Sequence, residues 1–146
     1  MSVLVDTNVL LRLRGSETAR RSVFDNALEQ LVNRGEALHL CTQVAIEFWS
    51  VATRPLDVNG FGLDPAAAKE RLRYFATLLV WLPEPADVGQ RWLALVNRCD
   101  VRGKQVHDAR LVAFMEAHGL THILTLNTAD FTRYPTITAL DPNNVR

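Results

Sequence analysis

Four acidic side chains occupy positions at which a carboxylate could bind a ligand or take part in catalysis: Asp6, Glu47, Asp108 and Asp130. Asp6 directly follows the apolar run of residues 3–5, whose β-branched valines favour a buried strand. Ligands of open parallel sheets bind at the carboxyl ends of the strands, so Asp6 would stand at the binding crevice. The alternative is that Asp6 only caps the helix expected to begin near Val9, because Asp is a common capping residue.

Glu47 and Asp108 each lie on an apolar face of a predicted helix. Apolar residues at helical spacing accompany both acids: Val44, Phe48 and Val51 around Glu47, and Leu111, Val112 and Met115 after Asp108. A carboxylate among buried apolar side chains is costly unless a cation or hydrogen bonds hold it. The alternatives are that Glu47 reaches solvent at the rim of its face, and that Asp108 interacts with the dipole at the start of its helix. His107 is expected to face solvent or to support the site rather than to bind a metal.

The fourth acid follows another short apolar run. Residues 122–126 predict a strand, and Asn127, Thr128 and Asp130 come directly after it, with Phe131 as an apolar anchor. The turn therefore places polar side chains just beyond a strand, as Asp6 is placed. Asp130 could equally be a turn or helix cap, which is a common role for Asp.

Short apolar strands alternate with helical patterns along the whole chain. Strands are predicted at 3–5, 37–41, 78–82 and 122–126, with a short edge strand at 137–140. Helices are predicted at 9–13, 17–33, 42–53 with Thr42 as N-cap, 64–76, 87–98 and 106–118. This alternation predicts one α/β domain over residues 1–146, a three-layer sandwich with a central parallel sheet of four to five strands flanked by helices.

The composition limits the classes of partner. Lys plus Arg and Asp plus Glu both number 16, so any contact with nucleic acid must come from local patches rather than from bulk positive charge. Cys41 and Cys99 lie in apolar surroundings, which is typical of core residues in a reducing compartment. No apolar run approaches the roughly 18 residues of a membrane span, and a strand beginning at Val3 leaves no room for a signal peptide. We therefore expect a cytoplasmic protein without membrane contact.

The predicted topology can bring all four acids to one crevice. Four carboxylates there repel each other unless a divalent cation neutralises them. Oxygen ligands without Cys and without an obligatory His suit Mg²⁺ or Mn²⁺, and such sites commonly serve phosphoryl chemistry. Basic residues flank the acids and could hold phosphates of a polyanion, although a solvated surface is the simpler role for some of them: Arg12, Arg14, Arg102 and Lys104.

Four motifs occur in a fixed order: Val-Asp-Thr-Asn-Val-Leu-Leu at 5–11, the helical Glu47, Asp108-Ala109 after a basic turn, and Ile-Leu-Thr-Leu-Asn-Thr-Ala-Asp-Phe at 123–131. This set resembles the PIN-domain ribonucleases, in particular the single-domain VapC toxins of bacterial toxin–antitoxin pairs. The resemblance covers essentially the whole chain. It implies a parallel sheet between helices, in agreement with the pattern of elements.

The resemblance implies roles for particular residues. Asp6, Glu47 and Asp108 match the three core acids of the family. Many members have an acid where this chain has Asn127; we favour Asp130 as the fourth acid and Asn127 as a neutral ligand or water-positioning group.

Three further residues match supporting positions of the family. Thr7 and Asn8 match the hydroxyl and the amide beside the first acid, and Thr125 matches a frequent Ser or Thr before the last turn.

Family likeness further implies a Mg²⁺-dependent endoribonuclease, usually a homodimer, that a cognate antitoxin wraps and blocks. Asp6, Asp108 and Asp130 would bind one or two Mg²⁺ ions, and Glu47 would complete the site or order the attacking water. Cleavage would leave a 5′-phosphate and a 3′-hydroxyl. The alternative is a catalytically inactive PIN-like binding module that engages an antitoxin or RNA.

Two other classes of protein are disfavoured. A receiver-like signalling domain needs a phosphorylatable Asp, and the strands that end at Cys41 and Leu82 supply none. An HD-type phosphohydrolase needs further metal histidines at helical spacing, which are missing. If the protein dimerises, we expect the helix at 64–76 and the preceding loop, with apolar Leu56, Phe61 and Leu63, to form the interface.

Overall fold

A computed structural model describes residues 1–13 and 22–146 of the chain. Five strands form one parallel sheet: β1 Ser2–Val5, β2 Ala37–Leu40, β3 Val80–Trp81, β4 His122–Leu124 and β5 Thr138–Leu140. Their order in the sheet is β3-β2-β1-β4-β5, which puts the first strand of the chain at the centre. The predicted α/β class and the parallel sheet are confirmed.

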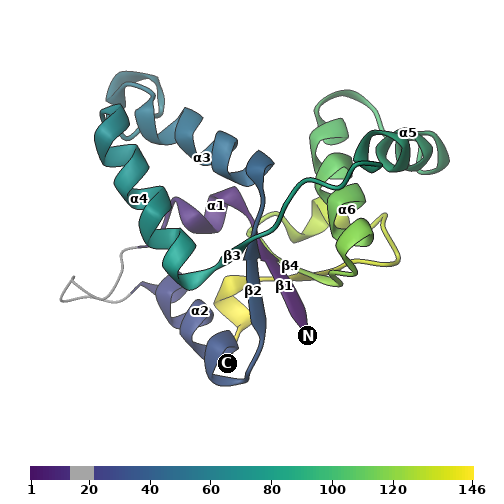
Figure 1. The fold of residues 1–146 in the computed structure, drawn as a ribbon, viewed down its shortest axis with the longest axis horizontal. Helices are drawn as coiled ribbons and strands as arrows, with labels where there is room; N and C mark the ends of the chain where they lie inside the picture. Colours follow the sequence, from purple (N-terminus) through teal and green to yellow (C-terminus); the bar gives the residue numbers. More distant parts are fainter. Residues whose placement is uncertain (14–21) are drawn as a thin grey trace.

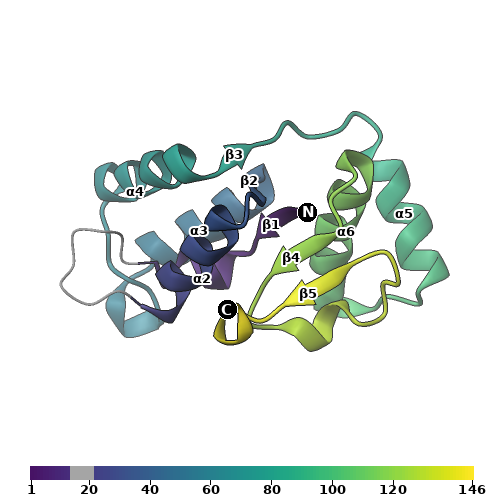
Figure 2. The ribbon, with the colours of Figure 1, turned by 90° about the horizontal axis from the view of Figure 1, so that it is seen from below.

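Helices cover both faces of this sheet. They are α1 Thr7–Leu10, α2 Val23–Asn33, α3 Thr42–Thr53, α4 Pro65–Leu78, α5 Val88–Arg98 and α6 Val106–His118. Short 3₁₀ turns are η1 Leu56–Val58, η2 Gly103–Gln105, η3 Thr128–Phe131 and η4 Pro142–Asn144. In both ribbon views α1 to α4 lie on one side of the sheet and α5 and α6 on the other, which gives the expected three layers (Figures 1 and 2).

The end of helix α4 and the length of strand β3 differ from what the sequence predicts. The helix expected to end near residue 76 continues through Leu78, because the N–H of Leu79 still donates to the carbonyl of Phe75 at 2.8 Å. The strand expected at 78–82 is therefore reduced to Val80–Trp81. Its side chains are exposed because β3 forms the edge of the sheet.

Helix starts also differ in detail. The helix expected at 9–13 begins at Thr7, because Asp6 provides its cap. Cys41, not Thr42, is the N-cap residue of α3, and the Thr42 hydroxyl instead accepts the indole N–H of Trp81 at 3.2 Å. Helix α2 begins after a capping box made by Ser22; the expected helical residues 17–21 lie outside the described residues.

The core is densest around β1 and α3. Val3, Leu4 and Val5 are fully buried, which explains why the sequence of β1 is continuously apolar rather than alternating. Phe48 of α3 meets Phe75 of α4 edge to face, with ring centres 5.1 Å apart and an angle of 86° between the rings. This packing fixes α3, and with it the acid that α3 carries.

The strand order creates a switch point beside β1. Connections from β1 to β3 pass on the side of α1 to α4, whereas the connection from β3 to β4 passes on the side of α5 and α6 (Figure 1). The crevice at such a point, outside the carboxyl ends of the strands, is where ligands bind in open α/β sheets. Asp6 follows β1 and Thr125 follows β4, and the Asp6 N–H donates to the carbonyl of Leu124 at 3.0 Å.

The two cysteines lie in or against the hydrophobic core. Cys41 is buried and Cys99 partly buried, and both thiols are free. Burial raises the pKa of the Cys41 thiol to about 12, which keeps it protonated and unreactive. In the parts of the chain that the structure describes, no helix is both long and apolar enough to cross a membrane.

Candidate active site

Asp6 caps α1 and also lies close to other acids. Its Oδ1 accepts the Thr7 N–H at 2.7 Å, and its Oδ2 accepts the Thr125 hydroxyl at 2.8 Å. The residue is only 7% exposed. Burial raises the pKa of its carboxyl, and the charges of Glu47 and Asp130 raise it further, against the opposing effect of the two hydrogen bonds. Asp6 can therefore cap the helix and lie at the binding crevice at the same time.

A hydrogen-bond network around Thr125 ties the turn after β4 to α1. Thr125 is fully buried, and its Oγ1 accepts the Asn8 side-chain amide at 3.2 Å and the Asn127 N–H at 3.1 Å. The Asn8 Oδ1 accepts the N–H of Leu126 at 3.1 Å. Thr125 and Asn8 thus hold Asp6 in place. The Asn127 side chain is exposed, and only its backbone takes part in this network.

Glu47 is held from two sides at the rim of its apolar face. Its Oε2 accepts the Thr7 hydroxyl at 2.9 Å, and its Oε1 accepts the side-chain amide of Gln43 at 3.1 Å. Gln43 is 8% exposed and also donates to the carbonyl of His107 at 2.8 Å. Glu47 is partly buried, so it is held by hydrogen bonds on the apolar face and also reaches solvent at the rim. Gln43 was missed by the sequence analysis, although its spacing of four residues from Glu47 places both on one helix face.

Arg110 extends this arrangement across to α6. It donates to the Gln43 Oε1 at 2.8 Å and to the Glu84 Oε1 at 2.9 Å, so it orients the amide that holds Glu47. Arg110 and Glu84 were also missed. No local pattern could have found them, because the contacts join residues 67 and 26 positions apart.

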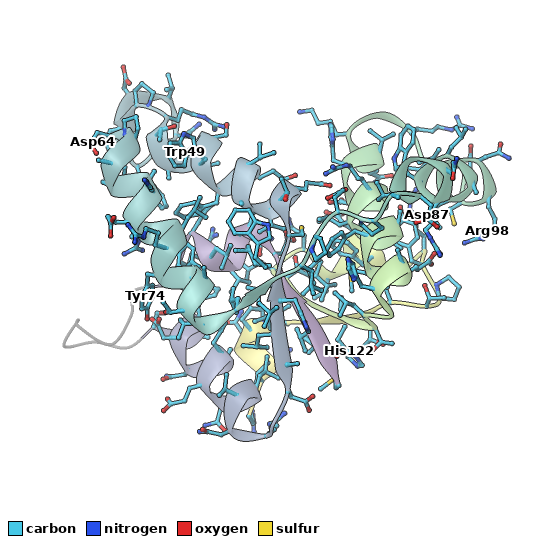
Figure 3. The ribbon with its side chains drawn as sticks, in the orientation of Figure 1. Trp49, Asp64, Tyr74, Asp87, Arg98 and His122 are labelled. Carbon is cyan, nitrogen blue, oxygen red and sulfur yellow. The ribbon has the colours of Figure 1, made fainter. Side chains whose placement is uncertain are left out.

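Asp108 is affected by the charges of the other three acids. It lies in the first turn of α6 and is partly buried. Burial raises the pKa of its carboxyl to about 6, and the charges of Asp6, Asp130 and Glu47 contribute in that order. Asp130 lies exposed in η3. The structure therefore brings all four predicted acids within electrostatic reach of one another, and Figure 3 shows oxygen-tipped side chains in the space between α3 and α6.

A PIN-domain family model matches residues 3–136 of the chain. The chain belongs to the PIN-domain family. It is 30% identical to Ribonuclease VapC48 of Mycobacterium tuberculosis, in an alignment that covers 97% of this chain and 98% of that protein. The resemblance seen in the sequence motifs is confirmed.

Solved structures share the fold of this PIN domain. VapBC2 from Rickettsia felis, bound to a DNA fragment from the promoter, gives a TM-score of 0.71 at 16% identity, over 96% of this chain and 98% of that one. A toxin–antitoxin complex from Klebsiella pneumoniae gives a TM-score of 0.61 at 21% identity, over 96% and 97%. The predicted PIN-like architecture is therefore confirmed.

The donor set of this PIN domain fits a hard divalent cation. The four acids supply only carboxylate oxygens. The pKa values of Asp6 and Asp108 are raised first by burial and then by the charges of the neighbouring acids, and a cation would offset both effects. Within residues 1–13 and 22–146, no three His, Cys, Asp or Glu side chains approach closely enough to enclose an ion directly. Mg²⁺ commonly keeps several waters and binds through one or two carboxylates, so a hydrated ion matches this wider spacing.

The basic residues that flank the acids in sequence make other contacts. Arg102 is exposed and pairs with Asp100 at 3.0 Å. Arg12 donates to the carbonyl of Asn8 at 2.6 Å, and its guanidinium lies 5.8 Å from the centre of the Phe24 ring. Lys104 is exposed, and Arg14 lies outside the described residues. Phosphate binding by these four residues stays a prediction.

The expected dimer surface lies away from the acids. Leu56 is 78% and Phe61 45% exposed, whereas Leu63 is partly buried against the core. Asp64, the N-cap of α4, marks this end of the α3–α4 pair in Figure 3, opposite the end that meets the sheet. Its use as an interface stays a prediction.

Proposed function

We propose that this PIN-domain protein is a Mg²⁺-dependent endoribonuclease and the toxin of a toxin–antitoxin pair. The observation that carries the proposal is the gathering of four mutually repelling acids at the switch point of the sheet. Similarity to VapC48, which is named a ribonuclease, supports RNA as the substrate. Similarity to VapBC2 and to a toxin–antitoxin complex supports a protein antitoxin as partner. From the resemblance of the sequence motifs to VapC toxins we also propose a homodimer in the cytoplasm.

Asp6, Asp108 and Asp130 are the proposed Mg²⁺ ligands, with Mn²⁺ as a substitute and Glu47 completing the site. The exposed Asn127 adds a neutral oxygen donor beside Asp130. When bound, the ion lowers the pKa of a water and neutralises charge on the phosphate oxygens.

The chain's own residues supply the positioning. Thr125 fixes the Asp6 carboxylate, while Thr7 and Gln43 hold one oxygen each of Glu47. Carboxylates held in this way are ready to orient a water toward a phosphodiester without rearranging. Because the ligands must be deprotonated, and the pKa of Asp108 is about 6 without metal, we expect Mg²⁺ affinity and cleavage to fall below about pH 6.

An RNA-cleavage assay on protein freed of antitoxin tests the proposal. Structured cellular RNAs are incubated with Mg²⁺, with EDTA, and with the Asp6→Asn variant. The control is Asp57→Asn, which makes the same exchange at an exposed residue of η1. Cleavage is expected to require Mg²⁺, to survive in the control, and to fall about a hundredfold or more in Asp6→Asn. Cleavage that persists in EDTA, or unchanged cleavage by Asp6→Asn, would contradict the proposal.

The second candidate is the catalytically inactive binding module. The spacing of the acids favours it, because no three of the acidic, His or Cys side chains within the described residues enclose an ion directly. It predicts that Mg²⁺ neither binds nor raises the melting temperature at pH 8, and that RNA or an antitoxin binds without cleavage. RNA cleavage that Asp6→Asn abolishes, with antitoxin binding unchanged, would exclude it.

A further inference from the structure

A hollow of about 560 Å³ opens between α3 and α6, beside the acids. It is lined by Gln43, Ile46, Glu47, His107 and Arg110. Ligand pockets range from roughly 300 to 1,000 Å³, so its size suits a small organic group. Glu47 belongs to both the hollow and the acidic cluster, which makes the two spaces neighbours.

The walls of the hollow suit a nucleobase. Ile46 is 62% exposed, so its apolar side chain is available to a group that enters the hollow. His107 is exposed on the opposite helix. Proteins that recognise single-stranded RNA stack unpaired bases on aromatic and imidazole rings and on guanidinium planes. An aliphatic side chain facing an imidazole offers the same kind of surface.

Arg110 offers N–H donors to the hollow, although its charge is balanced by an ion pair with Glu84 at 2.9 Å. Its side chain is 39% exposed, and its hydrogen bonds to Gln43 and Glu84 use two of the five N–H donors of a guanidinium. Donors therefore remain for an anionic group. Arg110 is held in place by its two partners, so it offers these donors without first losing much side-chain freedom.

We propose that this hollow binds the nucleotide next to the cleaved phosphodiester, with its base between Ile46 and His107 and its phosphate on Arg110. The inference rests on the proposed cleavage at the acids, because Glu47 is shared. A base can enter only if it is unpaired, so the substrate is RNA that presents a single-stranded or looped-out nucleotide at this position.

The first test measures binding without cleavage. The four ribonucleoside 5′-monophosphates are titrated into the metal-free protein, and methyl NMR signals of Ile46 are followed. Ribose 5-phosphate, which lacks a base, is the matched ligand. We expect at least one nucleotide to shift the Ile46 signal and to bind about fivefold or more tightly than ribose 5-phosphate, the low end of a stacking contact. Equal binding of the two ligands, or no shift at Ile46, would overturn the inference.

The second test uses matched variants in the RNA-cleavage assay. Ile46→Ala and His107→Ala should each lower kcat/KM about fivefold or more. Leu93→Ala makes the same kind of exchange on α5, at 63% exposure and away from the hollow, and should cleave like the unchanged protein. In Figure 3 the labelled Asp87 and Arg98 mark the ends of α5. All three variants should unfold at similar temperatures, because all three positions are exposed.

The two tests separate failure of this inference from failure of the proposed function. If the protein cleaves RNA but Ile46→Ala and His107→Ala cleave equally well, the nucleotide position is wrong and the nuclease stands. If nucleotides bind at Ile46 but no RNA is cleaved, the hollow is a nucleotide site and the nuclease proposal is wrong.

Discussion

Neutralising Asp108 should stabilise the metal-free protein above pH 6. Its pKa is raised from 3.8 to about 6, first by burial and then by the charges of Asp6, Asp130 and Glu47. The folded state therefore binds this proton more tightly than the unfolded chain. The free energy of unfolding falls as pH rises between those two values, and the loss is complete above the higher one.

The size of the effect follows from the difference between the two pKa values. A rise from 3.8 to about 6 corresponds to about 3 kcal/mol at 1.36 kcal/mol per pKa unit. Asp108 is only partly buried, so solvent screening reduces this to about 1–2 kcal/mol. In a domain of this size each kcal/mol moves the melting temperature by about 2–4 °C, so Asp108→Asn should raise it by about 2–8 °C at pH 8.

Thermal unfolding followed by circular dichroism in EDTA measures this difference. At pH 5 the gain should be about half of that at pH 8, and near pH 3 it should almost vanish, because both states then bind the proton. Asp57→Asn, which removes an exposed carboxylate, should change the melting temperature little at any pH. Added Mg²⁺ should stabilise the unchanged protein more than Asp108→Asn. An unchanged or lower melting temperature for Asp108→Asn at pH 8 would refute the raised pKa of Asp108 on which this reasoning depends.

Three further substitutions test the surroundings of the acids. Gln43→Leu removes the amide from Glu47 and should lower kcat for RNA cleavage about tenfold, at a stability cost of about 1–2 kcal/mol; an unchanged kcat would show that this contact does not position Glu47. Thr125→Val keeps the shape but leaves the Asp6 carboxylate without its hydroxyl donor, so urea unfolding should show a loss of about 1–3 kcal/mol that Thr125→Ser largely avoids. Phe48→Ala empties the contact with the aromatic ring of α4 and should cost about 3–5 kcal/mol; an unmoved urea midpoint would contradict that packing.

The sequence by itself determined the elements and the type of chemistry. The continuous apolar run before Asp6 predicted a strand buried on both faces, and β1 is that strand. Helical spacing around Glu47 and Asp108 predicted two helices, which α3 and α6 confirm. These features are local, because periodicity and capping act within a few turns of chain, and the alternation of strands and helices then left few topologies open.

Only the tertiary structure decided how the acids are held and what lies beside them. Arg110 orients Gln43 from 67 residues away and draws in Glu84 from the segment after β3. The hollow exists only because α3 and α6, which follow different strands, meet across the switch point. Such contacts depend on the relative placement of whole elements, which local sequence patterns do not specify. Arg102, which lies near Asp108 in sequence, pairs with Asp100 instead, whereas Glu84, which is distant from all four acids in sequence, is joined to the site through Arg110.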